Sequence, residues 1–84
     1  MKKSINTREA KLVAEMLYQI RVSVGLRQSD LAKKLQVPQS FVSKLESGER
    51  RIDIVELRNI LKHLDTNIVE FATTLEKRVN ETRS

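Results

Sequence analysis

The amino-acid sequence predicts an all-α protein, and three observations support that prediction. Only two glycines and one proline interrupt its 84 residues. Apolar residues recur every three or four positions along most of the chain, which is the period of a helix. No segment alternates apolar and polar residues over the length of a strand. A chain this short is expected to form a single domain, residues 1–84, with a core at about 8–80.

The first expected helix covers residues of about 8–24. Its apolar side is made of Leu12, Val13, Met16, Leu17, Ile20 and Val24. Asn6 and Glu9 have the spacing of a capping box, in which each side chain bonds the other residue's backbone N–H. Gly25 follows the last apolar residue and is expected to end the helix.

Two short helices come next, at about 28–35 and 39–47, separated by Gln36-Val37-Pro38. Pro38 suits the start of the second of these helices, where its missing N–H leaves no bond unmade. Gly48 is expected to end it.

The last two expected helices open with the same capping signature. The two pairs are Asp53 with Glu56, and Asn67 with Glu70. The fourth helix is expected to run to about Leu64, and the fifth to fray near Asn80. Residues 81–84 are then expected to form a disordered tail.

The fifth helix carries an apolar stripe that is longer than a small core needs. Ile68, Phe71 and Ala72 are expected to close the core of one molecule. Leu75 and Val79 continue the stripe beyond it, so they are predicted to form the interface of a homodimer. The simpler alternative is that the helix bends back and buries both residues within one molecule.

Charge and composition restrict the possible functions. The formal net charge is +5, and residues 1–51 alone carry a net +6, which suits either a basic binding surface or an ordinary soluble one. There is no cysteine and only one histidine, His63, so neither a disulfide nor a metal cluster is expected. No leader peptide or membrane span is recognisable, which predicts a cytoplasmic protein with no membrane partner.

The helix expected at 39–47 has an unusual exposed side. Val42 and Leu45 lie on one side of it at 100° per residue. The opposite side carries Ser40, Ser43, Lys44 and Ser47, and Gln39 stands at the N-terminal end. Such a polar helix, clamped by its neighbours, fits the major groove of B-DNA. Taken alone, the same pattern also fits an ordinary solvent-exposed face.

The spacing of the apolar residues favours the interpretation as a helix that enters the major groove. Leu31, Ala32, Leu35, Val37, Val42 and Leu45 fall at the positions of a helix-turn-helix. Together with Leu17, Ile20 and Arg21, the segments "GLRQSDLA" and "VPQSFVSKLESGERRID" resemble the Cro/phage-repressor (XRE) family over about residues 13–71. The resemblance implies a five-helix repressor-type domain whose third helix enters the major groove.

The resemblance also implies roles for individual residues. Those expected to contact DNA are Arg27, Gln28, Gln39, Ser40, Phe41, Ser43, Lys44, Arg50 and Arg51. Gln39 has the chemistry for a bidentate contact with adenine, and Lys44 for guanine or a phosphate. Gln28 would contact a phosphate or support the recognition helix. Phe41 would pack on a thymine methyl group or a sugar, or cover the edge of the core.

Arg21 and Glu46 match an ion pair of the family that holds the first helix against the third, which is a structural role. Two residues depart from the family pattern. Gln36 stands where a glycine often takes a left-handed conformation, and Arg27 stands where serine or threonine usually caps the second helix.

The predicted function is sequence-specific binding of double-stranded DNA by a small transcriptional regulator, with a repressor favoured. The partner would be a palindromic operator read by a homodimer. The alternative is a protein-interaction module, for example an antitoxin whose main partner is a toxin. No nucleophile–base arrangement, phosphate loop or metal cluster is recognisable, so neither an enzyme nor a cofactor is expected.

Overall fold

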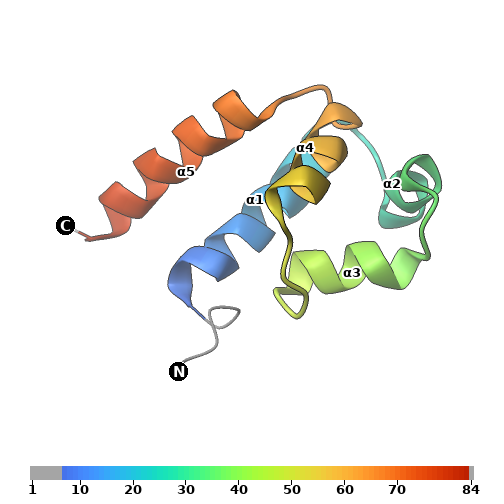
Figure 1. The fold of residues 1–84 in the computed structure, drawn as a ribbon, viewed down its shortest axis with the longest axis horizontal. Coiled ribbons are helices and arrows are strands. Elements are labelled where there is room, and N and C mark those ends of the chain that lie inside the picture. Colours follow the sequence, from blue (N-terminus) through green and yellow to red (C-terminus); the bar gives the residue numbers. More distant parts are fainter. Residues whose placement is uncertain (1–6, 84) are drawn as a thin grey trace.

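The structure, a computed structural model, describes residues 7–83, and this range contains five α-helices and no strand (Figure 1). The helices are α1 (Arg8–Ser23), α2 (Gln28–Leu35), α3 (Gln39–Ser47), α4 (Ile54–Lys62) and α5 (Ile68–Arg83). The all-α prediction is therefore confirmed. In Figure 1, α2 and α3 form one end of the molecule, and α5 runs outward on the opposite side.

The start of α1 differs from the prediction by one residue. Thr7 is the N-cap, and its hydroxyl oxygen accepts a hydrogen bond from the backbone N–H of Ala10 at 3.1 Å. The predicted cap, Asn6, lies outside the described residues. Threonine serves this position well because its short hydroxyl side chain reaches back to the first turn. Gly25 follows the helix with φ +81°, as its role of ending α1 requires.

Both predicted caps at the C-terminal side of the chain are present. Asp53 accepts from the backbone N–H of Glu56 at 2.7 Å, and the Glu56 carboxylate accepts from the Asp53 N–H at 3.3 Å. Asn67 accepts from the N–H of Glu70 at 3.0 Å. Their short side chains fix where α4 and α5 begin.

The ends of these two helices were predicted less well. α4 ends at Lys62 instead of Leu64, because the chain turns there and Asp65 takes a left-handed φ of 59°. α5 continues to Arg83, beyond the predicted fraying near Asn80, and the disorder expected for the tail stays a prediction. No glycine or proline interrupts this stretch, and the backbone can continue its helical hydrogen bonds. Ser84 lies outside the described residues.

All five helices contribute to the core. Its buried residues are Met16, Leu17, Leu31, Ala32, Val42, Leu45, Ile60, Leu61, Leu64 and Phe71. Ile68 and Leu75 are partly buried against it. Ala72, expected to help close the core, is exposed, because it lies one residue beyond buried Phe71 and 100° further around the helix. Within residues 7–83, no helix is long and apolar enough to cross a membrane.

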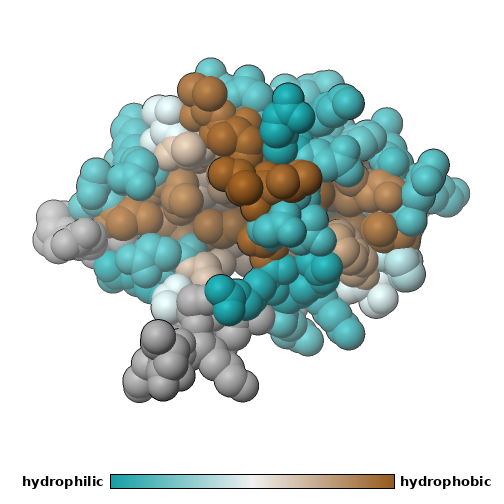
Figure 2. All heavy atoms as spheres, viewed as in Figure 1, coloured by the Kyte–Doolittle hydropathy of each residue, from teal (hydrophilic) through white to brown (hydrophobic). Residues whose placement is uncertain are grey.

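Three apolar side chains on α4 and α5 remain open to solvent. Ile54, Val55 and Val69 keep 67%, 74% and 71% of their surface exposed, and together they are called the apolar patch below. Figure 2 shows apolar surface over α4 and the start of α5, and further apolar surface along α5 and at the α2 end of the molecule. The patch lies outside α2 and α3.

Candidate nucleic-acid interface

The turn between α2 and α3 sets the angle at which α3 is presented. Gln36 takes the left-handed conformation, with φ 60° and ψ 46°. The next residue, Val37, donates its N–H to the carbonyl of Ala32 at 3.0 Å, which closes the end of α2. The turn thus has the conformation that glycine favours, built on a glutamine instead.

One side of α3 is fixed and the other is open. Val42 and Leu45 are buried in the core and hold the helix from beneath. The predicted contact residues Gln39, Ser40, Ser43 and Lys44 are all exposed. A helix of nine residues is marginal alone, so this row of polar groups keeps its position through the packing underneath.

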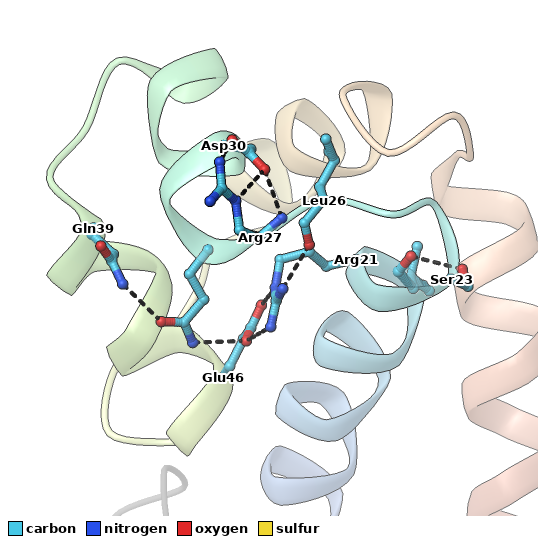
Figure 3. Close-up of polar contacts among 9 residues, drawn as sticks. Arg21, Ser23, Leu26, Arg27, Asp30, Gln39 and Glu46 are labelled. Atoms are coloured by element: carbon cyan, nitrogen blue, oxygen red, sulfur yellow. Dashed lines mark hydrogen bonds and ion pairs between the residues drawn. The ribbon is translucent and has the colours of Figure 1, made fainter.

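A buried ion pair joins α1 to α3, as the resemblance implied. Arg21 Nε lies 2.7 Å from Glu46 Oε2 and Arg21 Nη2 lies 2.9 Å from Oε1, a bidentate arrangement. The side chains are only 9% and 6% exposed. The third nitrogen, Nη1, donates to the carbonyl of Leu26 at 2.7 Å (Figure 3). The hydrogen bond to Glu46 raises the pKa of Arg21 above its ordinary value, and burial opposes this only in part.

Glu46 also connects to the exposed end of α3. Gln28 Nε2 donates to Glu46 Oε1 at 3.0 Å, and Gln39 Nε2 donates to Gln28 Oε1 at 3.4 Å. Gln28 thus lies between the buried ion pair and a predicted base-contacting residue. The sequence predicted a supporting role for Gln28 but not these partners, because 18 and 11 residues separate it from them and no periodicity relates the three.

Arg27 lies at the start of α2 with its side chain 82% exposed. Its guanidinium contacts Asp30 at 3.2 Å, and its backbone N–H donates to the same carboxylate at 2.9 Å. The Arg27 side chain makes no capping hydrogen bond to the backbone, in keeping with the weak cap that the sequence suggested. Its hydrogen bond to Asp30 lowers the pKa of that carboxyl group.

The two arginines after α3 have different surroundings. Arg50 pairs with Glu56 of α4 at 3.1 Å, and its guanidinium stacks on the ring of Phe41 at 4.3 Å. Phe41 is half-buried against the core, so Arg50 covers part of its remaining surface. Arg51 is exposed. The hydrogen bond from Arg50 lowers the pKa of Glu56. The sequence identified Glu56 only as a cap and gave no sign of its pairing with a loop arginine.

Comparison with known proteins identifies the class. The family model described as helix-turn-helix matches residues 17–71, well over half of the chain, so the protein belongs to the helix-turn-helix family. The resemblance to the XRE type is thereby confirmed, and with it the function of a transcriptional regulator that binds DNA sequence-specifically. A comparison with curated protein sequences found no match.

Similar solved structures include those of a restriction-modification controller protein, C.Esp1396I. Its wild-type structure has a TM-score of 0.80 at 28% identity, over 88% of this chain and 97% of that chain. Its tetramer in complex with a natural 35 base-pair operator has a TM-score of 0.77 at 29% identity, over 86% and 95%. The same protein bound to a 25 base-pair operator site has a TM-score of 0.78 at 28% identity, over 88% and 97%.

Proposed function

We propose that this protein represses transcription by placing α3 in the major groove of an operator. The observation that carries the proposal is the exposed row Gln39, Ser40, Ser43 and Lys44 on a helix fixed by buried contacts. A fixed row of donors and acceptors can distinguish base edges, because each base pair has its own pattern in that groove. On this proposal the protein acts in the cytoplasm, by binding and not by catalysis.

The exposed side chains divide into two expected groups. Gln39 would bind an adenine, Lys44 a guanine or a phosphate, and the two serines either bases or phosphates. Arg27 and Arg51 would bind phosphates on either side of α3. Arg50 would do so only by exchanging Glu56 for a phosphate, and Phe41 would contact DNA only at its uncovered edge.

The test is a set of single alanine variants. Gln39→Ala and Lys44→Ala should each weaken operator binding by about 1–3 kcal/mol and relax the preference at one base pair. Arg51→Ala should weaken binding to all sequences alike and reduce the slope of log K against log salt by about 0.9. Lys77→Ala, an exposed lysine on α5, is the matched control and should change neither. Unchanged base preferences in both α3 variants would contradict the assignment of α3.

We further propose that the protein binds its operator as a homodimer joined through the apolar patch. Leu75 is already partly buried in its own core, and Val79 is half-buried, so the residues first expected at the interface are the less available ones. Ile54, Val55 and Val69 are exposed, and burying them removes apolar surface from water. Residues 52–84 carry a net charge of only −1, so two such surfaces repel weakly. The tetrameric complex of the similar controller protein favours a second copy as the occupant.

Sedimentation of two variants separates the surfaces. Val55→Glu/Val69→Glu should be monomeric and should lose most operator affinity, because one subunit reads only half of a palindrome. Val79→Glu should remain a dimer. A dimeric Val55→Glu/Val69→Glu variant together with a monomeric Val79→Glu variant would instead place the interface at the C-terminal part of α5. A wild-type protein that stays monomeric on operator DNA would contradict dimerisation. The antitoxin alternative stays a prediction.

A further inference from the structure

A pocket of about 240 Å³ lies between the start of α1, the end of α3 and the loop after α3. Figure 1 shows the first turns of α1 and this loop on the same side of the molecule. The apolar lining of the pocket includes Ala10, Ala14, Leu17, Leu45 and Ile52. Protein interiors are closely packed, and an engineered apolar cavity of about 150 Å³ binds benzene. The pocket is therefore large enough for a small organic molecule.

Two small residues on α1 leave this space open. Ala10 and Ala14 are four residues apart, so they lie on the same face of the helix. Leu17 and Leu45 belong to the buried core, so the pocket reaches from the surface down to the core. A longer side chain in place of Ala14 would extend into the pocket and fill it.

The charged lining of the pocket is positive. Arg50 and Arg51 line it, and none of the other described lining residues is acidic. Arg50 is held by Glu56 and by the ring of Phe41. Arg51 is exposed and makes no ion pair within residues 7–83. Arginine binds a carboxylate through two parallel hydrogen bonds, so Arg51 is the group that a carboxylate in this pocket would meet.

We infer that the pocket binds a small apolar monocarboxylate, about the size of phenylacetate, whose carboxylate pairs with Arg51. The apolar part of such a molecule leaves water for the alanine and leucine side chains, and its charge stays at the rim. A carboxylate that holds Arg51 also withholds it from a DNA phosphate, so the ligand and the operator each weaken the binding of the other. This second step rests on the proposed function, since it assumes the phosphate contact of Arg51.

Calorimetric titration without DNA tests the site itself. Wild-type protein should bind phenylacetate about tenfold more tightly than phenethyl alcohol, which has the same ring and chain but no charge. Arg51→Gln should bind the two molecules equally. Ala14→Leu should bind neither, and Ala72→Leu, at an exposed alanine on α5, is the matched control and should bind phenylacetate as wild type does. Urea unfolding checks each fold, and Arg51→Gln decides the question without altering a buried residue.

Titration of operator DNA tests the competition. Saturating phenylacetate should weaken operator binding by the wild type severalfold and reduce the slope of log K against log salt, as Arg51→Ala does. It should not change operator binding by Arg51→Ala or Ala14→Leu, because the first lacks the shared arginine and the second lacks the pocket.

Three results would overturn the site. The first is a wild-type protein that binds phenylacetate no more tightly than phenethyl alcohol. The second is a folded Ala14→Leu variant that binds phenylacetate unchanged. The third is binding that requires the removal of residues 2–6, which would assign the pocket to the chain's own N-terminal segment.

The remaining outcomes separate the site from the function. If phenylacetate binds as expected but operator affinity does not change, the competition is wrong and the binding site stands. If Arg51→Ala leaves DNA binding unchanged, the phosphate contact in the proposed function is wrong, whereas the titrations without DNA still decide whether the site exists.

Discussion

The two sides of this small domain differ in the groups that they fix and the groups that they expose. On the α1–α3 side, polar groups are fixed: a bidentate ion pair is buried, and Gln28 is held between it and α3. On the α4–α5 side, apolar groups are left open, and α5 leaves the body of the molecule beyond its first turns (Figure 1). The first side pairs its polar groups within one chain, whereas the second exposes apolar side chains that a second molecule would cover.

The difference has a physical reason. A buried ion pair adds little net stability, because desolvation offsets most of the attraction, but its geometry is demanding. It therefore suits a helix whose angle must be fixed before DNA arrives. Exposed valine and isoleucine side chains contribute no hydrophobic stabilisation to a monomer. They stabilise an assembly when a second surface covers them.

The largest expected effect comes from removing one partner of the buried pair. Glu46→Ala leaves the Arg21 guanidinium buried without its carboxylate and should lower the free energy of unfolding by roughly 3–5 kcal/mol. Glu76→Ala, an exposed glutamate on α5, should change it by less than about 0.5 kcal/mol. Urea denaturation without DNA, at equal protein concentration, measures both. Equal stabilities of the two variants would show that the α1–α3 side is not held by this pair.

The sequence predicted the fold better than the contacts within it. The bounds of α2 and α3 agree with the prediction because Pro38 and Gly48 punctuate the chain next to clear apolar spacing. The end of α5 was missed because no comparable residue marks it. Arg21 and Glu46 were identified through the family resemblance, since residues 25 apart have no periodic relation.

The contacts that the sequence did not predict depend on how the helices are rotated against each other. The apolar residues at the start of α4, Ile54 and Val55, fit a buried face as well as an exposed one until the packing of that helix is known. Likewise, the contact of Arg50 with Glu56 requires the loop after α3 to fold back onto α4. Neither follows from local propensity or spacing.

An intermediate effect is expected at the two left-handed residues, one on each side of the molecule. Gln36 precedes α3 with φ 60°, and Asp65 precedes α5 with φ 59°. A left-handed conformation costs most side chains about 1–2 kcal/mol, but aspartate tolerates it better. Glycine removes that cost, but it lowers the free energy of unfolding by about 0.4–1 kcal/mol because it makes the unfolded chain more flexible. Gln36→Gly should therefore be neutral or stabilising by up to roughly 1.6 kcal/mol, and Asp65→Gly should gain less.

Thermal unfolding of the two glycine variants measures this difference. A clear loss of stability in Gln36→Gly would mean that the glutamine side chain contributes more in this turn than its backbone strain costs. The Gln36 side chain would then stabilise the α1–α3 side as well, in addition to the Arg21–Glu46 ion pair and the hydrogen bonds of Gln28.

The smallest effect is expected at the ion pair that joins the two sides, Arg50 with Glu56. Both side chains are about one-third exposed, at 36% and 34%, so the pair should contribute only about 0.2–1 kcal/mol. The hydrogen bond from Arg50 lowers the pKa of Glu56 in the folded protein below its ordinary value of 4.5. The unfolded chain then binds the proton more tightly, so this stability is present above about pH 4.5 and is lost as the pH falls through the lower, folded-state pKa. Glu56→Gln should accordingly be less stable than wild type at pH 7, and the two should converge at pH 3.

A second substitution shows whether Arg50 causes that pH dependence. In an Arg50→Met background, Glu56→Gln should have a smaller effect at pH 7, and its difference from the parent should depend less on pH. Urea unfolding at pH 7, 5 and 3 provides the comparison. On the proposed function Arg50 would reach a phosphate only by leaving Glu56, so the single Glu56→Gln variant should also bind non-specific DNA slightly more tightly. A pH-independent difference, unaffected by Arg50, would instead assign the effect of Glu56 to its cap at the start of α4.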